Sequence, residues 1–355
     1  MAGETVSDVA IAGAGIIGLA LGLELLGRGY SVTVVERDAA MRAASSAAGG
    51  MLAVHDPQNP MALMPLCLRS SELYPAFLDR VEQLSSLKVP VRTRWTMQHV
   101  DRARHDATLT SEAEVSEFAP GLQIGDTIYE WLQEDSLDPK DLAAALPKAF
   151  VAAGGILLEH TAVRNVDPHG GAVQLRTSVG TVSAAEFVNC CGSWAGEPGL
   201  GLERLPVAPV KGQMIDLQCA PERLRCVVRA PGIYLIPRGD GRVTTGSTLE
   251  QAGFDSNVDE QTVARIASAA RSLLPELEIA ANGESWAGLR PGTPDLLPVL
   301  GQGQARHCWH ATGHYRDGIL LAPATARVMA QAIAGEEPDV AIEPFRPGRF
   351  AAVRR

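Results

Sequence analysis

The hydrophobic positions of the first forty residues change their period twice. The run Val9-Ala-Ile-Ala is short and uniformly apolar, which predicts a buried strand. Residues 19–30, LALGLELLGRGY, repeat their apolar positions with helical spacing and end at glycine and tyrosine. Residues 31–37, SVTVVER, again have the composition of a strand. The pattern therefore predicts a β-α-β unit within about thirty residues.

Three later stretches have a helical pattern. We expect helix over 60–86, interrupted at Pro65 and Pro75 because proline cannot donate a helical hydrogen bond. Residues 138–155, DPKDLAAALPKAFVAAGG, predict a helix that ends at two glycines. Residues 261–277 have amphipathic spacing and predict another helix.

Strands are expected between and after these helices. The clearest single strand covers residues 91–100, VRTRWTMQHV. Residues 156–196 predict several short strands and turns, and residues 207–250 predict an antiparallel sheet with a hairpin at 238–241. These later pieces indicate a second, sheet-based domain.

The first predicted strand runs directly into a glycine motif, Gly13-Ala-Gly15-Ile-Ile-Gly18. At this position the glycines allow a tight turn, close approach of a pyrophosphate and close packing of helix on strand, with the phosphates at the helix N-terminus. Glu36 ends the second strand, 18 residues after Gly18, where a carboxylate accepts hydrogen bonds from ribose hydroxyls. The unit predicts dinucleotide binding and leaves the choice between NAD and FAD open.

Composition and charge narrow the class of partner. The chain has 355 residues, 46% hydrophobic and 20% charged, which is typical of a globular enzyme with one large or two modest domains. The formal net charge is −10, so neither nucleic acid nor an anionic membrane surface is expected as the main partner. The apolar stretches are too short or too interrupted by glycine for a membrane span.

The six cysteines include no C-x-x-C pair. Cys190 and Cys191 follow an apolar run, so we expect buried thiols rather than redox or metal chemistry, in a reducing compartment. The first residues, MAGETVSD, lack the basic segment of a signal peptide. We therefore expect a cytoplasmic protein, and the sequence leaves assembly into a homo-oligomer open.

A loop of small residues, RAASSAAGGM at 42–51, follows the second predicted strand and allows a ligand to approach the backbone. Together with the glycine motif and the pair Glu36-Arg37, it resembles the FAD-dependent amino acid oxidases, the group of D-amino acid, sarcosine and glycine oxidases. The resemblance implies an FAD cofactor. In this part of the chain the implied FAD contacts are Gly13, Gly15, Ile16, Ile17, Gly18, Glu36, Arg37, Ser45, Ser46, Gly49, Gly50, Met51, Val163 and Gly192. Trp194, beside the last of these, is expected in the core.

The C-terminal third carries GLRPGTPD at 288–295 and GHYRDGILLAPAT at 313–325. On its own, Arg290 among apolar residues indicates either a bound carboxylate or phosphate or a structural salt bridge. The two stretches together resemble the glycine oxidases, the branch linked to the thiazole part of thiamine biosynthesis. This resemblance implies that Arg290 binds the substrate carboxylate, that Tyr234 assists it, and that Arg316 lies near flavin and substrate.

Gly318-Ile-Leu-Leu is expected to begin a helix whose N-terminus points at the flavin. Unpaired N–H groups and the positive helix end stabilise the negative charge of a reduced flavin. His314 is expected as a structural hydrogen-bond partner. Cys308 is the only cysteine near the place where sarcosine oxidases hold their flavin covalently, and it is expected in a strand, so we expect non-covalent FAD. The FAD contacts implied here are Tyr315, Arg316, Asp317, Gly318, Ile319 and Leu320.

By resemblance the fold class is α/β, with a Rossmann-type FAD-binding domain of the GR2-like flavoprotein kind and a second α+β substrate domain on a mixed or antiparallel sheet. The first domain is expected to be discontinuous, over 1–86, 145–210 and 285–355. The second is expected over 87–144 and 211–284.

The implied activity is oxidative deamination of glycine or another small amine. Hydride passes from the α-carbon of the neutral amine to the flavin, and the imine hydrolyses to a 2-oxo acid (glyoxylate from glycine) and ammonia. Molecular oxygen reoxidises the flavin and gives hydrogen peroxide.

Three alternatives remain at this point. The first is a D-amino acid oxidase, a sarcosine-type oxidase or a quinone-linked dehydrogenase of the same fold. The second is an NAD-dependent dehydrogenase, which leaves the small-residue loop and the C-terminal motif without a role. The third is a non-enzymatic nucleotide-binding protein.

Overall fold

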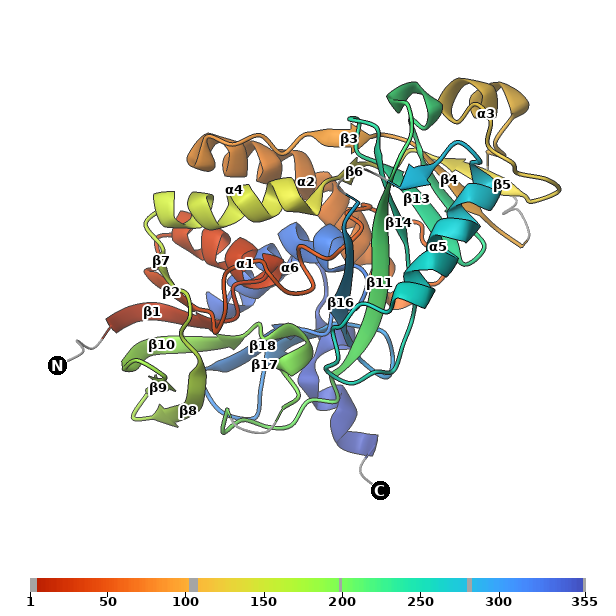
Figure 1. The fold of residues 1–355 in the computed structure, drawn as a ribbon. Coiled ribbons are helices and arrows are strands. Elements are labelled where there is room, and N and C mark those ends of the chain that lie inside the picture. The colour runs from red at the N-terminus through yellow and green to blue at the C-terminus, as the bar shows by residue number, and fades with distance from the viewer. Residues whose placement is uncertain (1–4, 102–107, 198–199, 280–282, 354–355) are drawn as a thin grey trace.

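The computed structural model describes residues 5–101, 108–197, 200–279 and 283–353. Figure 1 shows two parts: a sheet covered by several helices at the left, and a second sheet with helix α5 (Glu260–Leu273) at the right. Within the described ranges, no helix combines the length and the hydropathy needed to cross a bilayer.

The first sheet contains the predicted β-α-β unit. Its strands are β1 (Thr5–Ala12), β2 (Val32–Val35), β7 (Ile156–Leu158), β8 (Val163–His169), β9 (Ala172–Thr177), β10 (Thr181–Asn189), β17 (Val299–Gln302) and β18 (Cys308–Thr312). The order is β17-β18-β10-β1-β2-β7, parallel except for the β17–β18 pair, and β9 and β8 continue antiparallel from β10. Helix α1 (Ile16–Gly27) joins β1 to β2, as the apolar pattern predicted.

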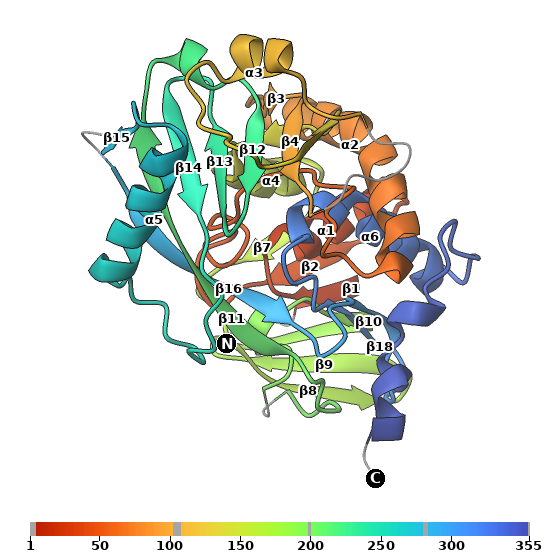
Figure 2. The same ribbon diagram turned by 90° about the vertical axis from the view of Figure 1, so that its right-hand side faces the viewer.

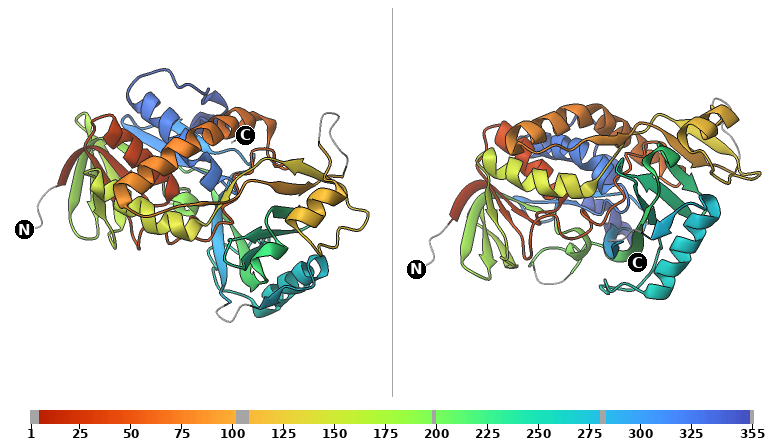
Figure 3. Two further views of the ribbon diagram at one scale, coloured as in Figure 1. Left: turned by 90° about the horizontal axis from the view of Figure 1, so that it is seen from above. Right: turned by 45° about the horizontal axis from the view of Figure 1, so that its top comes forward.

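Four helices gather on one face of this sheet (Figures 1 and 3). They are α1, α2 (Met64–Ser85), α4 (Pro139–Ala152) and α6 (Gly318–Ile333). Their apolar sides bury residues such as Leu19 and Leu146 together with Ile11 of β1. The neighbouring strand positions point the other way, and Ala10 packs with Val173 in a smaller core under β8 and β9.

Helix α2 is continuous, so the predicted interruption at Pro75 is wrong. Pro65 lies in the first turn, where a missing N–H has no helical partner to lose, but Pro75 lies inside the helix. Its neighbours are tied to α6: Ser70 Oγ and Tyr74 Oη donate to carbonyls of the first turn of α6, at 2.5 and 2.8 Å. These tertiary bonds help to offset the helical bond that Pro75 cannot make.

The second sheet is mixed. Its strands are β4 (Thr96–His99), β5 (Tyr129–Leu132), β11 (Ala208–Gln218), β12 (Val227–Ala230), β13 (Ile233–Pro237), β14 (Arg242–Gly246), β15 (Glu278–Ile279) and β16 (Ser285–Gly292). The order is β15-β11-β14-β13-β12-β4-β5, β16 also pairs with β11, and only the β4–β12 pair is parallel. Helix α5 covers the outer face (Figure 2), where Ile266 and Ala270 pack with Leu235.

The single strand predicted over 91–100 is wrong, because this segment forms two strands in different sheets. Strand β3 (Val91–Thr93) pairs with β6 (Ser136–Leu137), whereas β4 joins the second sheet. Trp95, between β3 and β4, stacks on Trp131 at 5.3 Å and belongs to the core under the second sheet. The helix α3 (Glu112–Phe118) follows in the same region.

The predicted hairpin at 238–241 is confirmed between β13 and β14, and the helices predicted over 138–155 and 261–277 are confirmed as α4 and α5. The α/β fold class with a second mixed sheet is confirmed as well. The exact division of the chain into two discontinuous domains stays a prediction. Side chains alternate along β13. Leu235 therefore faces α5, while Tyr234 faces the opposite side and lines the cavity between the two sheets.

Candidate active site

A cavity of about 1780 Å³ lies between the two sheets. Its wall is formed by the carboxyl ends of β1, β2, β10 and β18, by the first turns of α1 and α6, and by the inner faces of β11, β12, β13 and β16. Ligands of open parallel sheets bind at the carboxyl ends of the strands. Most residues predicted for the site line this cavity: Gly13, Gly15, Ile16, Ile17, Glu36, Arg37, Ser45, Gly49, Gly50, Met51, Val163, Gly192, Tyr234, Arg290, Tyr315, Arg316, Asp317, Gly318 and Ile319.

Three of the predicted residues lie outside the wall. A Cβ on Gly18 would come within 2.0 Å of the Gly13 carbonyl, so Gly18 serves the close packing of α1 on the turn. Ser46 makes a local hydrogen bond to the carbonyl of Ala43, at 3.4 Å. Leu320 is buried under α2.

The glycine turn is built for a group that must come close to the backbone. Gly13 has φ +105°, and a Cβ there would lie 2.4 Å from the Cys190 carbonyl. Gly15 is the N-cap of α1 and offers no side-chain cap, so this end of the helix is open to the cavity. Ser45 Oγ accepts the N–H of Ile16 at 2.9 Å and thereby attaches the small-residue loop to the helix N-terminus.

Glu36 braces the same turn. One of its carboxylate oxygens accepts the N–H of Ala14 at 2.8 Å, and the other accepts the N–H of Asp38 at 3.0 Å. Both bonds hold the carboxylate at the end of β2 in the cavity wall. Each oxygen has a further lone pair, which leaves capacity for a ribose hydroxyl.

Trp194 was expected in the core, and the structure corrects this. Its half-buried ring lies in the cavity wall, with the Arg37 guanidinium 3.7 Å above the ring centre. Phe254, from the loop after β14, stacks on Trp194 at 5.3 Å. Arg37 and Trp194 belong to segments beside the first sheet and Phe254 to a loop of the second sheet, so three segments meet at this place in the cavity wall. Cys191 also lines the cavity and is only partly buried, whereas Cys190 is buried as expected.

Arg290 and Tyr234 both line the cavity although they lie on different strands. Arg290 crosses Gly212 of the neighbouring strand, where a Cβ would lie 2.2 Å from the guanidinium. Its guanidinium donates to Ser247 Oγ at 2.6 Å and to the Thr248 carbonyl at 3.1 Å. Gly246, next to Ser247, is the register partner of Tyr234.

This arrangement leaves the Arg290 side chain in the wall with donors beyond the two it uses, because a guanidinium has five N–H groups. The Tyr234 hydroxyl has only a weak sulfur partner, Met214 Sδ at 3.5 Å. Both groups are therefore available to bind a carboxylate.

Helix α6 begins at Gly318 as predicted, and its first residues line the cavity. Its N-cap, Asp317, makes no capping hydrogen bond. Burial raises the pKa of Asp317 to about 6, although the neighbouring Arg316 and Asn59 oppose this and Asp56 adds to it. His314 hydrogen-bonds Thr325 at 3.0 Å, and burial lowers the pKa of His314 to about 3. His314 is thus neutral at physiological pH.

Arg316 lines the cavity but also holds the loop after Ala53. Its guanidinium donates to Gln58 at 2.5 Å and lies 3.7 Å from Asp56. Asp56 also lies 3.7 Å from Arg229, a buried residue of β12 that donates to Glu134 at 2.7 Å. Arg229 and Glu134 carry no sequence motif, and only the folded chain brings them beside Arg316.

The size and the chemistry of the cavity fit FAD better than a small amino acid alone. Typical small-ligand pockets have about 300–1,000 Å³, well below this volume. The glycine cradle at Gly13, the open N-terminus of α1 and the Glu36 carboxylate suit a dinucleotide. No cluster of three or more His, Cys, Asp or Glu side chains that could hold a metal exists in the part of the chain that the structure describes.

Comparisons with known proteins agree with this geometry. Residues 8–332 match the family model described as FAD dependent oxidoreductase. Glycine oxidase of Pseudomonas aeruginosa is 35% identical over 360 residues, which cover 96% of this chain and 98% of that protein. The crystal structure of glycine oxidase from Geobacillus kaustophilus has a TM-score of 0.90 at 30% identity and covers 98% of this chain and 99% of that one.

A bifunctional protein ThiO/ThiG of Synechocystis is 37% identical over 98% of this chain, and the chain spans 54% of that protein, about half of its length. These comparisons confirm the resemblance to the FAD-dependent amino acid oxidases that the motifs indicated.

Proposed function

We propose that this chain, which belongs to the family of FAD dependent oxidoreductases, is an amino acid oxidase that deaminates glycine. FAD is its cofactor. The products are glyoxylate, ammonia and, with molecular oxygen as the electron acceptor, hydrogen peroxide. The relatives named glycine oxidase support glycine as the substrate.

One observation carries the proposal: a dinucleotide cradle and a carboxylate-binding pair line the same cavity. The cradle is the glycine turn with Glu36, and the pair is Arg290 with Tyr234. Cys308 is buried in β18 outside the cavity wall, which supports non-covalent binding of FAD.

FAD, when bound, would accept the hydride that leaves the α-carbon of the amino acid, and this hydride carries both electrons of the oxidation. Arg290 binds and orients the substrate carboxylate with its spare N–H groups, and the Tyr234 hydroxyl donates a further hydrogen bond. This positioning lowers the entropic cost of reaching the reactive geometry.

No side chain is assigned as a general base. The amine must be neutral to form the imine, and His314 is bonded to Thr325 and is not available for proton transfer. Ser247 and Thr248 act on Arg290 by holding its guanidinium in place.

The proposal also includes the setting of the reaction. All six cysteines are free thiols, which suits the reducing cytoplasm. The relatives named ThiO/ThiG support a place for the product in the thiazole branch of thiamine biosynthesis. Assembly into a homo-oligomer stays a prediction.

The test is the visible spectrum of the purified protein before and after anaerobic addition of glycine. We expect a bound-flavin spectrum that bleaches with glycine. A spectrum that ignores glycine but bleaches with sarcosine or a D-amino acid would retain the fold and the cofactor and change the substrate. A protein that carries no flavin and takes up none would contradict the proposal at its first step. Precipitation with acid distinguishes non-covalent flavin, which is released, from covalent flavin, which stays with the protein.

A further inference from the structure

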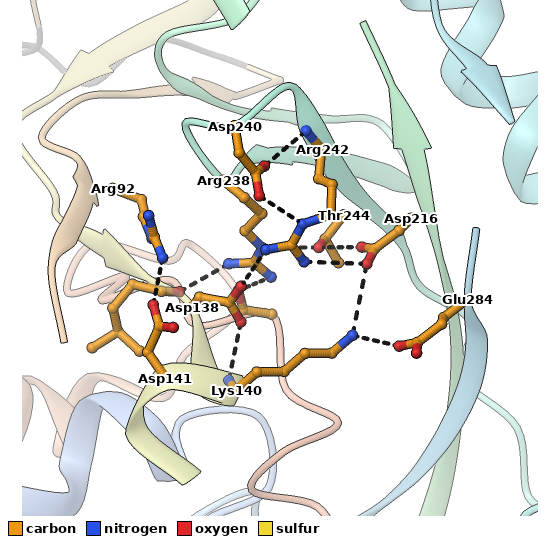
Figure 4. A network of polar contacts seen from close by, with 12 residues as sticks. Arg92, Asp138, Lys140, Asp141, Asp216, Arg238, Asp240, Arg242, Thr244 and Glu284 are labelled. Carbon is orange, nitrogen blue, oxygen red and sulfur yellow. Dashed lines mark hydrogen bonds and ion pairs between the residues drawn. The ribbon is translucent and has the colours of Figure 1, made fainter. Parts of the chain in front are cut away.

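Arg238, in the turn between β13 and β14, is a charged side chain with only 2% of its surface exposed. Its guanidinium contacts three separate segments (Figure 4). One terminal nitrogen donates to the Gly49 carbonyl at 3.0 Å, the other to the Leu137 carbonyl at 2.9 Å, and Nε donates to Thr244 Oγ1 at 2.9 Å. Arg238 therefore joins the small-residue loop, strand β6 and strand β14.

Arg238 donates to two carbonyls and a hydroxyl, although two carboxylates lie close to it. Asp138 and Asp216 raise the pKa of Arg238, while burial, the larger effect, lowers it. Both carboxylates are instead engaged by Arg242, at 3.1 and 3.5 Å, and Figure 4 shows this second arginine in the same network. Burying a guanidinium costs free energy unless its N–H groups are hydrogen-bonded. The use of this buried arginine to bind backbone carbonyls therefore suggests that it has a structural role.

The reason lies in the loop that it holds. The Gly49 carbonyl points to Arg238, and the next carbonyl, that of Gly50, accepts the N–H of Leu137 at 2.9 Å. Gly50 has φ +78°, and a Cβ there would lie 2.2 Å from the Leu137 carbonyl, so the loop lies tightly on β6. Both glycines line the cavity.

Peptide geometry then fixes the Gly50 N–H. In a trans peptide the C=O and N–H groups point in opposite directions, so an Arg238 bond to the Gly49 carbonyl turns the Gly50 N–H away from Arg238. Neither of the two carbonyls can then turn toward the cavity and compete with a ligand for donors.

We propose that Arg238 is a positioning residue of the cofactor site, which fixes the Gly49–Gly50 peptide so that the Gly50 N–H is presented to the bound FAD. This inference rests on the proposed function only in so far as FAD is the ligand. It requires no particular amine substrate.

The experiment is a titration of the full-length apoprotein with FAD, followed by flavin fluorescence. Arg238→Lys keeps the charge but cannot hold both carbonyls, and Arg238→Met removes all three donors. We expect FAD affinity to fall roughly 10- to 100-fold in both, the range for loss of a charge-assisted hydrogen bond. Arg242→Lys and Arg242→Met are the matched controls, because Arg242 lies in the same network and donates to neither glycine.

A second pair covers the case in which the Arg238 variants do not fold. Thr244→Val removes the acceptor of Nε and leaves the two carbonyl bonds unsupported, whereas Thr244→Ser keeps the hydroxyl. Thr244→Val should weaken FAD binding several-fold and broaden the vibrational structure of the bound flavin spectrum, and Thr244→Ser should restore both.

The proposal is overturned if FAD affinity and the flavin spectrum of all Arg238 and Thr244 variants match the wild type, or if the Arg242 controls lose as much affinity. It is supported if FAD affinity falls in the Arg238 variants and in Thr244→Val while the Arg242 controls and Thr244→Ser bind FAD as the wild type does. A wild-type protein that binds FAD but ignores glycine contradicts the proposed substrate and leaves this test intact.

Discussion

Arg290 shows how single residues make this cavity selective. Its guanidinium lies over a glycine, is held by Ser247 and Thr248, and keeps donors for a carboxylate. We expect Arg290→Lys to raise KM for glycine roughly 100-fold with a smaller effect on kcat, since truncating a charged hydrogen-bonded partner costs about 2–5 kcal/mol. Steady-state oxygen consumption measures both constants.

Ser247→Ala is the matched control for this prediction. It removes one support of the guanidinium but no donor to the substrate, so KM should rise only about fivefold, equivalent to about 1 kcal/mol. An unchanged KM in Arg290→Lys would remove Arg290 from the carboxylate site.

Asp317 gives a pH-dependent prediction at the same scale. Its folded pKa of about 6 lies above the ordinary value of 3.8, so the folded apoprotein holds this proton more tightly than the unfolded chain. Ionisation in the fold therefore costs stability as pH rises from about 4 to about 6. Asp317→Asn should match the wild type near pH 4 and be more stable above pH 6, by on the order of 2–3 kcal/mol. Urea unfolding of the apoprotein across this range measures the difference.

Asp295 provides a control of opposite sign. Burial raises its pKa, but the hydrogen bond from Arg349 and the charge of Arg349 lower it further, so the pKa lies below the usual range. That carboxylate stabilises the fold once pH exceeds its unfolded pKa, and Asp295→Asn should lose stability there. If Asp317→Asn also lost stability as pH rises, ionisation of the buried Asp317 would not destabilise the fold as we expect.

At the scale of elements, the parts that could be predicted from the sequence are those with local causes. The β1-α1-β2 unit and the start of α6 follow from apolar period and glycine placement within short windows. The meeting of Tyr234 with Ser247 and Arg290 depends on the register of four strands, which no local pattern specifies. The same holds for Phe254 on Trp194.

Arg238 illustrates the limit more sharply. In the sequence it is one residue of a hairpin signal, and turns are usually exposed. Its burial arises because β6 and the small-residue loop close over the turn, although Leu137 and Gly49 lie 101 and 189 residues earlier in the chain. The continuous course of α2 through Pro75 has a similar origin, since the side chains that hold it to α6 are distant in sequence.

The glycine turn yields a prediction for an element. Gly13→Ala places a Cβ at φ +105° and 2.4 Å from the Cys190 carbonyl, so β1 and β10 must separate and the apoprotein should lose stability. Gly15→Ala has an allowed backbone, and its Cβ lies 3.2 Å from Ser45 Oγ in the cavity wall. It should change apoprotein stability by about 1 kcal/mol or less yet weaken FAD binding at least about tenfold.

Thermal unfolding of both apoproteins and titration with FAD separate these two effects. Equal loss of stability in the two variants would mean that the turn serves the fold alone. Equal retention of FAD affinity would place the phosphates elsewhere in the cavity.

At the scale of the whole molecule, the cavity is shared by two sheets with separate cores, and the segments that connect them include β16 and the loops around 49 and 254. A ligand that contacts both walls therefore adds contacts between the two parts that the apoprotein lacks.

FAD at about 100 times its Kd should add about 2.7 kcal/mol to stability and raise Tm by roughly 5 °C or more. NAD at the same concentration should raise Tm by much less, because it shares only the adenosine diphosphate half with FAD and offers no flavin to the rest of the cavity. Scanning calorimetry of the apoprotein with each nucleotide measures this difference. A Tm that rises equally with both would mean that the cavity binds dinucleotides in general and has no preference for FAD.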